Sequence, residues 1–260
     1  MKAKRNRVTY REIHVWGDSL ARGVVYHEEK GRYAISRERC TTRLAEALPC
    51  KVENHSGMGA TVLDGLTRFQ PFHGAARALC AVEFGGNDCD LDWPYVAAHP
   101  DEAVTPKVPL SQFEATLEAF VAEIRRRGMS PLLVTPLPLH AERYFHWVTR
   151  ELDADAVLHA LGDVNHIYRW QERYAIAMQG VARRTRCRLL DLRDVMLSQP
   201  DYERLMCADG IHPNDAGHRL LSDAALAMAR AEGASFLNPA DAEAAEAPAT
   251  AIPSAAAYPN

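Results

Sequence analysis

The sequence lacks the features that mark membrane proteins, exported proteins and nucleic-acid-binding proteins. It has no run of about 18 consecutive apolar residues, so no membrane span is predicted. The basic start at residues 1–7 is not followed by an apolar segment as long as a signal peptide needs, and we expect a cytoplasmic location. An excess of one charge is also missing, because 30 basic and 34 acidic residues leave a net charge of −4. That balance gives no indication of nucleic-acid binding.

Metal, cofactor and disulfide patterns are missing too. None of the six cysteines forms a Cys-x-x-Cys pair, and we expect reduced, mostly buried thiols. The eleven histidines show no metal-ligand spacing with a partner cluster, and no Gly-x-Gly-x-x-Gly or phosphate-loop pattern occurs. Three acids in one loop, Asp88, Asp90 and Asp92, are better explained by bonds to water or to nearby N–H groups. The sequence therefore predicts no metal and no cofactor.

What is present is a regular alternation of short apolar runs and helical patterns. The runs cover residues 13–16, 51–54, 79–84, 131–135 and 188–192, and the helical patterns cover residues 37–48, 61–69, 111–127, 165–184 and 214–231. Ser111 and Glu114 form a candidate capping box, and Gly128 ends the same helix. This alternation predicts a doubly wound α/β fold with a parallel sheet. We expect one domain over residues 1–236 and a disordered Ala- and Pro-rich tail over residues 237–260.

Four segments carry residues suited to catalysis. Ser19 follows the first apolar run, and Asp209 and His212 lie three residues apart near the other end of the domain. Serine needs a base to become a nucleophile at neutral pH, and the base needs an acceptor that orients it. The segments at residues 54–61 and 84–88 can supply N–H donors for a developing oxyanion. Three of these segments follow predicted strands, at the edge where such sheets bind ligands.

Together, the four segments resemble those of the SGNH hydrolases, also called the GDSL esterase/lipase family, over about residues 11–231. The resemblance implies a flavodoxin-like, three-layer fold with five parallel strands. It also implies that Ser19 is the nucleophile, that His212 is the general base and then the general acid, and that Asp209 orients His212. The expected reaction is hydrolysis of a carboxylic ester through an acyl-serine, without a cofactor.

Three donors are expected to form the oxyanion hole. They are the backbone N–H of Ser19, the backbone N–H of Gly59 and the side-chain amide of Asn87. Gly57 competes with Gly59 for this role from sequence alone. The family pattern places the donor glycine five residues after the asparagine, which selects Gly59 and leaves Asn54 to brace the loop.

Purely structural roles are also open for the same residues. Ser19 alone fits a helix N-cap, and Asp18 is better explained by a local hydrogen bond that shapes the turn. The segment from Asp209 to Pro213 also fits a plain turn before a helix that Asn214 caps. The turn and the catalytic pair are compatible, because one turn can carry both side chains.

Three long connections, residues 21–36, 89–109 and 136–163, leave the expected active-site face and are interpreted as pocket walls or a lid. Their aromatic residues include Trp93, Tyr144 and Trp147, which we expect to contact the substrate. A partly covered aromatic pocket suits a small acyl group, such as acetyl on a sugar. The expected partner is therefore a small-molecule ester, and a homo-oligomer remains open.

Other functions fit parts of the pattern. An acyltransferase, a lysophospholipase or a thioesterase uses the same site chemistry with another acceptor or acyl chain. A non-catalytic binding module is less favoured, because all four functional segments are intact. A flavodoxin-type oxidoreductase has the same strand order but binds a coloured flavin, which we do not expect here.

Overall fold

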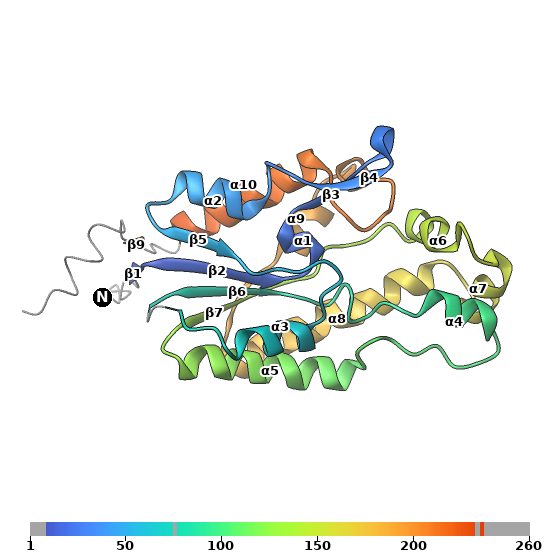
Figure 1. Ribbon diagram of the computed structural model, residues 1–260, viewed down its shortest axis with the longest axis horizontal. Coiled ribbons are helices and arrows are strands. Elements are labelled where there is room, and N and C mark those ends of the chain that lie inside the picture. The colour runs from blue at the N-terminus through green and yellow to red at the C-terminus, as the bar shows by residue number, and fades with distance from the viewer. Residues whose placement is uncertain (1–8, 75–76, 232–234, 237–260) are drawn as a thin grey trace, which may run out of the picture.

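The computed structural model describes residues 9–74, 77–231 and 235–236, with a sheet of five parallel strands at its centre (Figure 1). The strands are β2 Glu12–Gly17, β5 Lys51–Asn54, β6 Leu79–Glu83, β7 Ser130–Val134 and β8 Arg188–Leu190. They lie in the order β5-β2-β6-β7-β8, so the strand order reverses direction between β5 and β6. This is the flavodoxin-like order, and the predicted doubly wound α/β fold is confirmed.

Helices cover both faces of the sheet and complete three layers (Figure 1). One layer holds α3 Val62–Phe69, α5 Leu110–Arg126 and α8 Asn165–Thr185, and the other holds α2 Cys40–Ala47 and α10 Asp215–Ala231. Within the layers, α5 packs against α3 and α8, and α2 packs against α10. With both faces covered, the central strands need apolar side chains on each side, which explains their continuous apolar runs.

The main core lies between the sheet and α5. Phe113, Leu117, Phe120 and Ile124 recur at helical spacing along one side of α5 and are all fully buried. They pack in one cluster with Phe84, at the end of β6. Truncating a buried phenylalanine of this kind typically costs about 3–5 kcal/mol of stability. This layer therefore holds the carboxyl end of β6 in a fixed position.

The start of α5 differs from the prediction. The helix begins at Leu110, Pro109 occupies the N-cap position, and no side chain caps the first turn. The predicted capping box on Ser111 is therefore wrong, because Ser111 already lies inside the helix. Proline is tolerated at this position because the N–H that it lacks would have no partner within the helix. Gly128 follows the C-cap residue with φ of 75°, in agreement with the predicted helix end.

The three long connections contain more regular structure than the sequence predicts. Residues 21–36 include the antiparallel hairpin of β3 Val24–His27 and β4 Arg32–Ile35. Residues 89–109 include α4 Trp93–Ala98, and residues 136–163 include α6 Ala141–Thr149 and α7 Ala154–Leu161. The three helices share a second apolar cluster beyond the carboxyl ends of the strands (Figure 1). They therefore form packed walls at the edge of the sheet where ligands of such folds bind.

The remaining elements are short. They are β1 Thr9–Tyr10 and β9 Ser235–Phe236, which pair in parallel, α1 Ser19–Arg22, α9 Leu192–Leu197 and two 3-10 turns, η1 Glu28–Lys30 and η2 Tyr202–Leu205. The predicted tail at residues 237–260 lies outside the described residues. All six cysteines are described, and each is a free thiol. No helix in the described ranges has the length and apolar character needed to cross a membrane.

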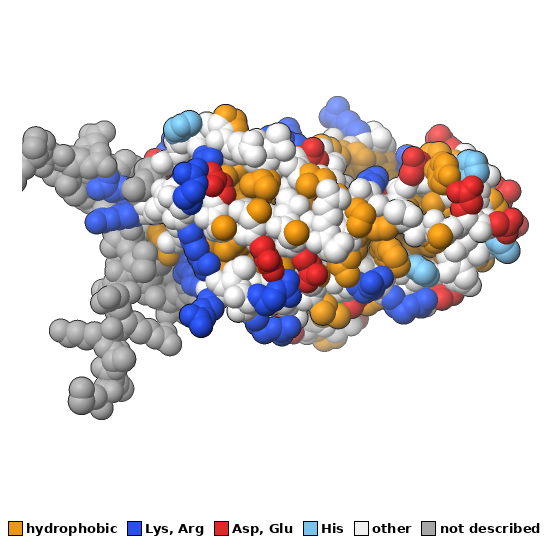
Figure 2. Space-filling view, turned by 90° about the horizontal axis from the view of Figure 1, so that it is seen from below, with side chains coloured by type: hydrophobic (Ala, Val, Ile, Leu, Met, Phe, Trp, Pro, Cys, Tyr) orange, Lys and Arg blue, Asp and Glu red, His pale blue; other side chains and the backbone are white. Residues whose placement is uncertain are grey.

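The outer face of the α5 layer carries charges of both signs. Figure 2 shows acidic and basic side chains interspersed on this face. Arg184 on α8, for example, pairs with Glu114 and Glu118 on α5. Exposed pairs of this kind contribute about 0–1 kcal/mol each. The apolar core beneath them therefore stabilises this layer more than its surface charges do.

Candidate active site

The turn after β2 places Ser19 at the carboxyl end of the sheet. Asp18 is the N-cap of α1, and its Oδ1 accepts a hydrogen bond of 2.8 Å from the N–H of Leu20. The predicted local role of Asp18 is therefore confirmed, and the cap of this helix is Asp18 rather than Ser19. Ser19 is the first residue of α1 and only 8% of its surface is exposed. Its hydroxyl is thus held at the base of a pocket rather than on the surface.

Ser19, His212 and Asp209 form a continuous hydrogen-bonded chain. The Nε2 atom of His212 lies 2.9 Å from Oγ of Ser19, and the Nδ1 atom lies 2.6 Å from Oδ2 of Asp209. An ionised Asp209 can only accept, so Nδ1 carries the proton and Nε2 is free to accept from the serine hydroxyl. Ser19 and His212 are 193 positions apart in the sequence, and the fold brings them into contact. These distances lie within the range that proton transfer requires.

Asp209 is buried and still favours its charged form. Its Oδ1 accepts hydrogen bonds from the backbone N–H groups of Ile211 and His212, each 3.1 Å long. Burial opposes ionisation, but these bonds and the hydrogen bond and charge of His212 hold the pKa of Asp209 below its usual value. Asp209 therefore remains a carboxylate at neutral pH and can stabilise a positive imidazole ring.

The turn that carries this pair is fixed at both ends. Gly210 has φ of 75°, and a Cβ at this position would lie 2.6 Å from the backbone nitrogen of Tyr144. After the turn, Oδ1 of Asn214 accepts from the N–H of Gly217, at 3.1 Å, and so caps α10 as predicted. The sequence Asp-Gly-Ile-His thus forms a tight turn that positions the side chains of Asp209 and His212.

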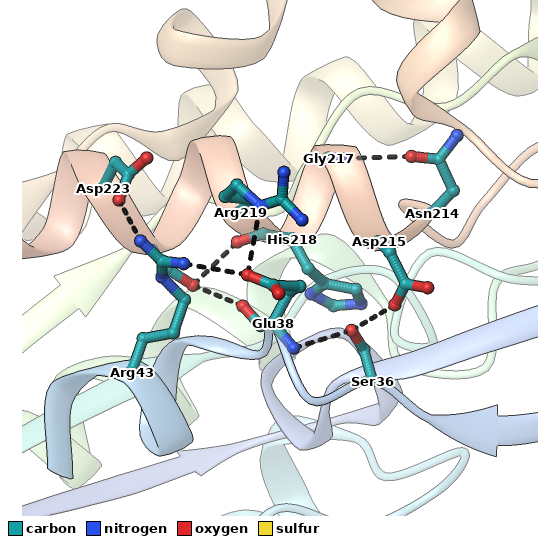
Figure 3. Close-up of polar contacts among 10 residues, drawn as sticks. Ser36, Glu38, Arg43, Asn214, Asp215, Gly217, His218, Arg219 and Asp223 are labelled. Atoms are coloured by element: carbon teal, nitrogen blue, oxygen red, sulfur yellow. Dashed lines mark hydrogen bonds and ion pairs between the residues drawn. The ribbon is translucent and has the colours of Figure 1, made fainter. Parts of the chain in front are cut away.

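Polar contacts tie the start of α10 to the segment before α2 (Figure 3). Ser222 donates a hydrogen bond of 2.8 Å to the backbone carbonyl of Glu38. The Glu38 carboxylate accepts from Arg43 and Arg219, and Ser36 donates to Asp215. Because α10 directly follows the turn with His212, these contacts limit how far the imidazole can move away from Ser19.

Gly57 and Gly59 differ in the availability of their N–H groups. The N–H of Gly57 donates to the carbonyl of Gly17, at 3.0 Å. No hydrogen bond among the described residues uses the N–H of Gly59, which has φ of 66°. Of these two glycines, only Gly59 thus keeps a donor for a ligand. Asn54 braces this loop as predicted, because its amide donates to the carbonyl of Ala21 and its Oδ1 accepts from the N–H of Ser56.

The amide of Asn87 points toward the turn that carries Asp18 and Ser19. Its Nδ2 lies 3.0 Å from Oδ2 of Asp18 and 3.2 Å from the carbonyl oxygen of Ala60. Both amide hydrogens therefore have acceptors within the protein. A bound oxyanion near Ser19 has to compete with Asp18 or Ala60 for one of them.

Asp18, which directly precedes Ser19, forms a buried carboxyl pair with Glu83. Burial raises the pKa of Asp18 to about 6, although its hydrogen bond from Leu20 and the charge of His212 favour the ionised form. Burial, and then the charge of Asp18, raise the pKa of Glu83 well above its usual value. The pair therefore retains a proton at neutral pH. Because the carboxyl pair carries one negative charge instead of two, it holds the amide of Asn87 less tightly.

A pocket opens over Ser19 and His212. Its walls come mainly from the segment after β6 and from α6, α7 and α8. The lining includes the residues Asp18, Ser19, Asn87, Cys89, Leu91, Trp93, Leu139, Tyr144, Leu161, His166, Ile167, Trp170, Gln171 and His212. Mainly apolar walls with a few polar groups at the base are typical of small-molecule sites.

Two of the three predicted aromatic residues lie in this pocket. Trp93 and Tyr144 both donate to Oδ1 of Asp90, at 2.9 and 2.7 Å, so one carboxylate fixes both rings. Trp147 is not among the lining residues, and its ring packs edge-on against Tyr26 with 4.7 Å between centroids. The reason is the helical turn of α6, which directs Trp147 to the hairpin of β3 and β4 instead of the pocket. Trp147 therefore lies outside the lining of this pocket, and its expected substrate contact stays a prediction.

The acids that follow β6 bind N–H and O–H groups. Asp88 accepts from the backbone N–H groups of Val62 and Gly85, each at 2.9 Å, and Asp92 caps α4. Burial raises the pKa of Asp88 to about 7. The three acids of this loop therefore hold its shape, as the sequence reading favoured.

The wall from α8 was missed by the sequence analysis, whereas α7 belongs to the connection at residues 136–163, which was interpreted as pocket wall. Ile167 and Trp170 lie about 150 positions from Ser19 and three residues apart on one helix, a spacing that usually indicates a core stripe. The one available signal was His166, a polar residue beside this stripe. Its neighbours line the pocket because α8 extends beyond the end of the sheet.

Known proteins share both the sequence pattern and the fold. The model of the GDSL-like Lipase/Acylhydrolase family matches residues 15–220. A lipase/acylhydrolase from Enterococcus faecalis is 21% identical, with a TM-score of 0.60 over 85% of this chain and 96% of that chain. An α/β hydrolase from the Lake Arreo metagenome is 22% identical, with a TM-score of 0.58 over 84% and 94%. An acetylxylan esterase from Geobacillus stearothermophilus is 20% identical, with a TM-score of 0.57 over 87% and 96%. No curated protein gives a significant match.

Proposed function

Since the chain belongs to the GDSL-like lipase/acylhydrolase family and is a hydrolase, we propose that it cleaves carboxylic esters through an acyl-serine intermediate. The observation that carries this proposal is the continuous contact from Ser19 through His212 to Asp209, with distances of 2.9 and 2.6 Å. A nucleophile, a base and an orienting carboxylate in one chain of hydrogen bonds is the arrangement that acyl transfer to serine requires.

In the acylation step, Ser19 Oγ attacks the acyl carbon while its proton passes to Nε2 of His212. The resulting imidazolium is stabilised by the Asp209 carboxylate, which the backbone N–H groups keep ionised. The tetrahedral intermediate then collapses, the ester C–O bond breaks, and His212 returns the proton to the leaving alkoxide.

In the deacylation step, water replaces the alcohol. His212 takes a proton from water, the resulting hydroxide attacks the acyl carbon, and Ser19 leaves with the proton that His212 returns. The same short contact between Nε2 and Oγ therefore serves both halves of the reaction. No metal or cofactor takes part in this scheme.

Three donors in this proposal stabilise the oxyanion: the N–H of Ser19, the N–H of Gly59 and the amide of Asn87. Support for Gly59 comes from its unused N–H, in contrast to that of Gly57. For Asn87, binding of the oxyanion replaces a contact with Asp18 or Ala60. Removal of one such donor typically costs about 2.7–4 kcal/mol of transition-state stabilisation.

The proposed substrate is an ester of a small acyl group, with acetyl esters of carbohydrates as the leading class. Trp93 and Tyr144 line the pocket and are both held by Asp90, which limits their adjustment to a long chain. Similarity of fold to an acetylxylan esterase fits this class. A second candidate, a medium-chain esterase or thioesterase, is favoured by the apolar wall of Leu139, Leu161 and Ile167.

Turnover of p-nitrophenyl esters with acyl chains of two to twelve carbons separates these two candidates. We expect kcat/KM to be highest for the acetyl ester and to fall as the chain lengthens. A clear maximum at six or more carbons contradicts the small-acyl proposal and favours the second candidate.

Hydrolysis of p-nitrophenyl acetate by the wild type, Ser19→Ala and Ser111→Ala tests the nucleophile. Ser111 is exposed on α5 and serves as the matched serine control. We expect kcat to fall by about 10³-fold or more in Ser19→Ala and to be unchanged in the control. Equal activity in all three proteins refutes the role of Ser19.

A further inference from the structure

A second cluster of ligand-type side chains lies at the edge of the sheet. His14 lies on β2, Glu53 lies on β5, which is the outermost strand, and His55 follows β5 directly. None of the three lines the pocket over Ser19. In the described ranges, this is the one group of His, Cys, Asp or Glu side chains whose atoms gather closely enough to share an ion.

The three atoms that face one another are spaced to fit one metal ion. Nδ1 of His14 lies 3.0 Å from Nε2 of His55 and 3.3 Å from Oε2 of Glu53, and the latter two atoms lie 3.8 Å apart. The centre of the circle through these three atoms is about 2.0 Å from each of them. Zinc binds histidine nitrogen and carboxylate oxygen at about 2.0–2.2 Å, so an ion fits this triangle with little movement of the ligands.

A second carboxylate orients the most buried ligand. Nε2 of His14 lies 2.9 Å from Oε2 of Glu12, which places the proton on Nε2 and leaves the Nδ1 lone pair facing His55 and Glu53. Histidines that bind metals usually donate their other N–H to a carboxylate or carbonyl in this way. The opposite oxygen of Glu53 is held by Lys51 Nζ at 2.7 Å, which leaves Oε2 directed at the two rings.

Aromatic packing fixes the rings of the cluster. The ring of His55 stacks on Trp16, with 4.3 Å between centroids and 13° between planes, and Phe72 meets both histidine rings edge-on. The His14 side chain is 1% exposed, whereas those of His55 and Glu53 are 24% and 36% exposed. Two ligands are therefore preset by packing, and the partly exposed side leaves room for entry of an ion and for a water ligand.

The ordinary alternative is a hydrogen-bonded histidine pair with no ligand. It explains the contact between His14 and His55, but it leaves Oε2 of Glu53 and Nδ1 of His14 as two acceptors 3.3 Å apart. Such a contact is unfavourable unless a proton or a cation lies between the two atoms. A cation bound to all three atoms removes this conflict.

We propose that His14, Glu53 and His55 bind one zinc ion. Two imidazoles and one carboxylate form a set of ligands that zinc prefers, whereas calcium and magnesium favour oxygen ligands alone. The ion joins β5 to β2 at the root of the loop that carries Gly59. Because only the folded chain brings the three ligands together, binding stabilises the native state. This proposal is independent of the esterase activity.

The test uses protein without a histidine tag, stripped of metal with a chelator and titrated with zinc against a chromophoric competitor. We expect one ion per chain and a rise in melting temperature on zinc addition. His55→Gln and Glu53→Gln are expected to weaken binding by at least about 100-fold and 10-fold, and Glu12→Gln by about 10–100-fold. His159→Gln, a change at an exposed histidine on α7, is the matched control and is expected to bind like the wild type.

Cobalt(II) gives an independent readout of the ligands. In the wild type and His159→Gln we expect the intense visible absorption of a four- or five-coordinate ion, and in His55→Gln we expect its loss. Circular dichroism and the melting temperature in chelator show whether each variant is folded. Absence of stoichiometric zinc binding, unchanged binding in folded His55→Gln and Glu53→Gln, or binding that depends on His212 instead overturns the proposal.

Discussion

Individual side chains at this site act through short contacts in a nearly dry environment. Asp209 and His212 are 0% and 2% exposed, and Ser19 is 8% exposed. Charges and hydrogen bonds interact more strongly in such surroundings than in water. Small changes of donor or acceptor at these positions therefore have large effects on the reaction, whereas the fold depends on other residues.

Asp209→Asn tests the orientation of the base. The substitution keeps the size of the side chain, but the carboxamide can place an N–H against Nδ1 of His212 and so favour the wrong tautomer. We expect kcat for p-nitrophenyl acetate to fall by about 10³- to 10⁴-fold, with little change in KM. Asp194→Asn, at an exposed position of α9, is the control. A loss of less than tenfold in Asp209→Asn contradicts the assigned role.

Asn87→Ala tests the oxyanion donor. Alanine removes the amide that now contacts Asp18 and Ala60, and with it one proposed donor to the transition state. We expect kcat to fall by about 10²- to 10³-fold, since the contact strengthens as negative charge develops. The exposed Asn165 on α8 supplies the control Asn165→Ala. If KM rises while kcat stays constant, Asn87 binds substrate but does not stabilise the transition state.

Among the elements, the turn from Asp209 to His212 is the one whose backbone matters most for the proposed ester hydrolysis. A Cβ at Gly210 would lie 2.6 Å from the backbone nitrogen of Tyr144 and 2.8 Å from the carbonyl oxygen of His140. The N–H of His140 also donates to the carbonyl of Gly210, at 2.8 Å. The turn is therefore packed against the start of α6, and a shift of either segment moves the side chains of Asp209 and His212.

Gly210→Ala and Gly128→Ala form a matched pair for this element. Both glycines have φ of 75°, but a Cβ at Gly128 meets no atom within 4 Å. We expect Gly128→Ala to lower the free energy of unfolding by about 1–2 kcal/mol and to leave the activity unchanged. Gly210→Ala is expected to cost more stability and to lower kcat by about 100-fold, because it displaces Asp209 and His212. Equal effects of the two changes on kcat show that the turn does not need this close approach.

Local patterns predicted some elements well and others poorly. The five strands and the helices α2, α3, α5, α8 and α10 follow from apolar periodicity, because each buries one stripe or face. The prediction failed where packing overrides local signals. Ser111 fits a cap, yet the helix already begins at Leu110, after Pro109 at the N-cap position. Residues 136–163 form α6 and α7 through an apolar cluster that a single sequence does not reveal.

For the site, the sequence was informative where chemistry demands a particular residue type. The residues Ser19, Asp209 and His212 come together in the structure, as the four segments had suggested. Trp147 packs against the hairpin of β3 and β4, because the direction of an aromatic side chain in a long connection depends on packing that one sequence does not reveal. The pocket wall from α8 was missed because Ile167 and Trp170 have the same spacing as core residues.

At the scale of the whole molecule, the fold buries acids close to the site. Burial raises the pKa of Asp88 to about 7, and it also raises the pKa values of Asp18 and Glu83. An acid with a raised pKa in the folded state binds more protons there than in the unfolded chain. The stability it contributes is present at low pH and is lost as the pH rises through its folded-state pKa.

Asp88→Asn isolates this effect. Relative to the variant, the wild type is expected to lose about 3 kcal/mol of unfolding free energy between pH 5 and pH 8, as Asp88 ionises. Urea denaturation at several pH values measures the difference between the two proteins. Loss of one acceptor at Val62 or Gly85 lowers the stability of the variant at every pH, so only the slope is compared. In the control Asp92→Asn, at an exposed position, the slope is expected to match the wild type, and a constant difference for Asp88→Asn contradicts the burial effect.

The central claim is that Ser19 is the nucleophile, and covalent labelling with a fluorophosphonate tests it most directly. Attack by Oγ of Ser19 on phosphorus releases fluoride and leaves a stable adduct, which peptide mass spectrometry locates. The mechanism predicts one adduct per chain on the peptide that contains Ser19, in step with loss of esterase activity, and no adduct in Ser19→Ala. An active wild-type enzyme that is inactivated through an adduct on another residue, or that stays active and unlabelled, contradicts it.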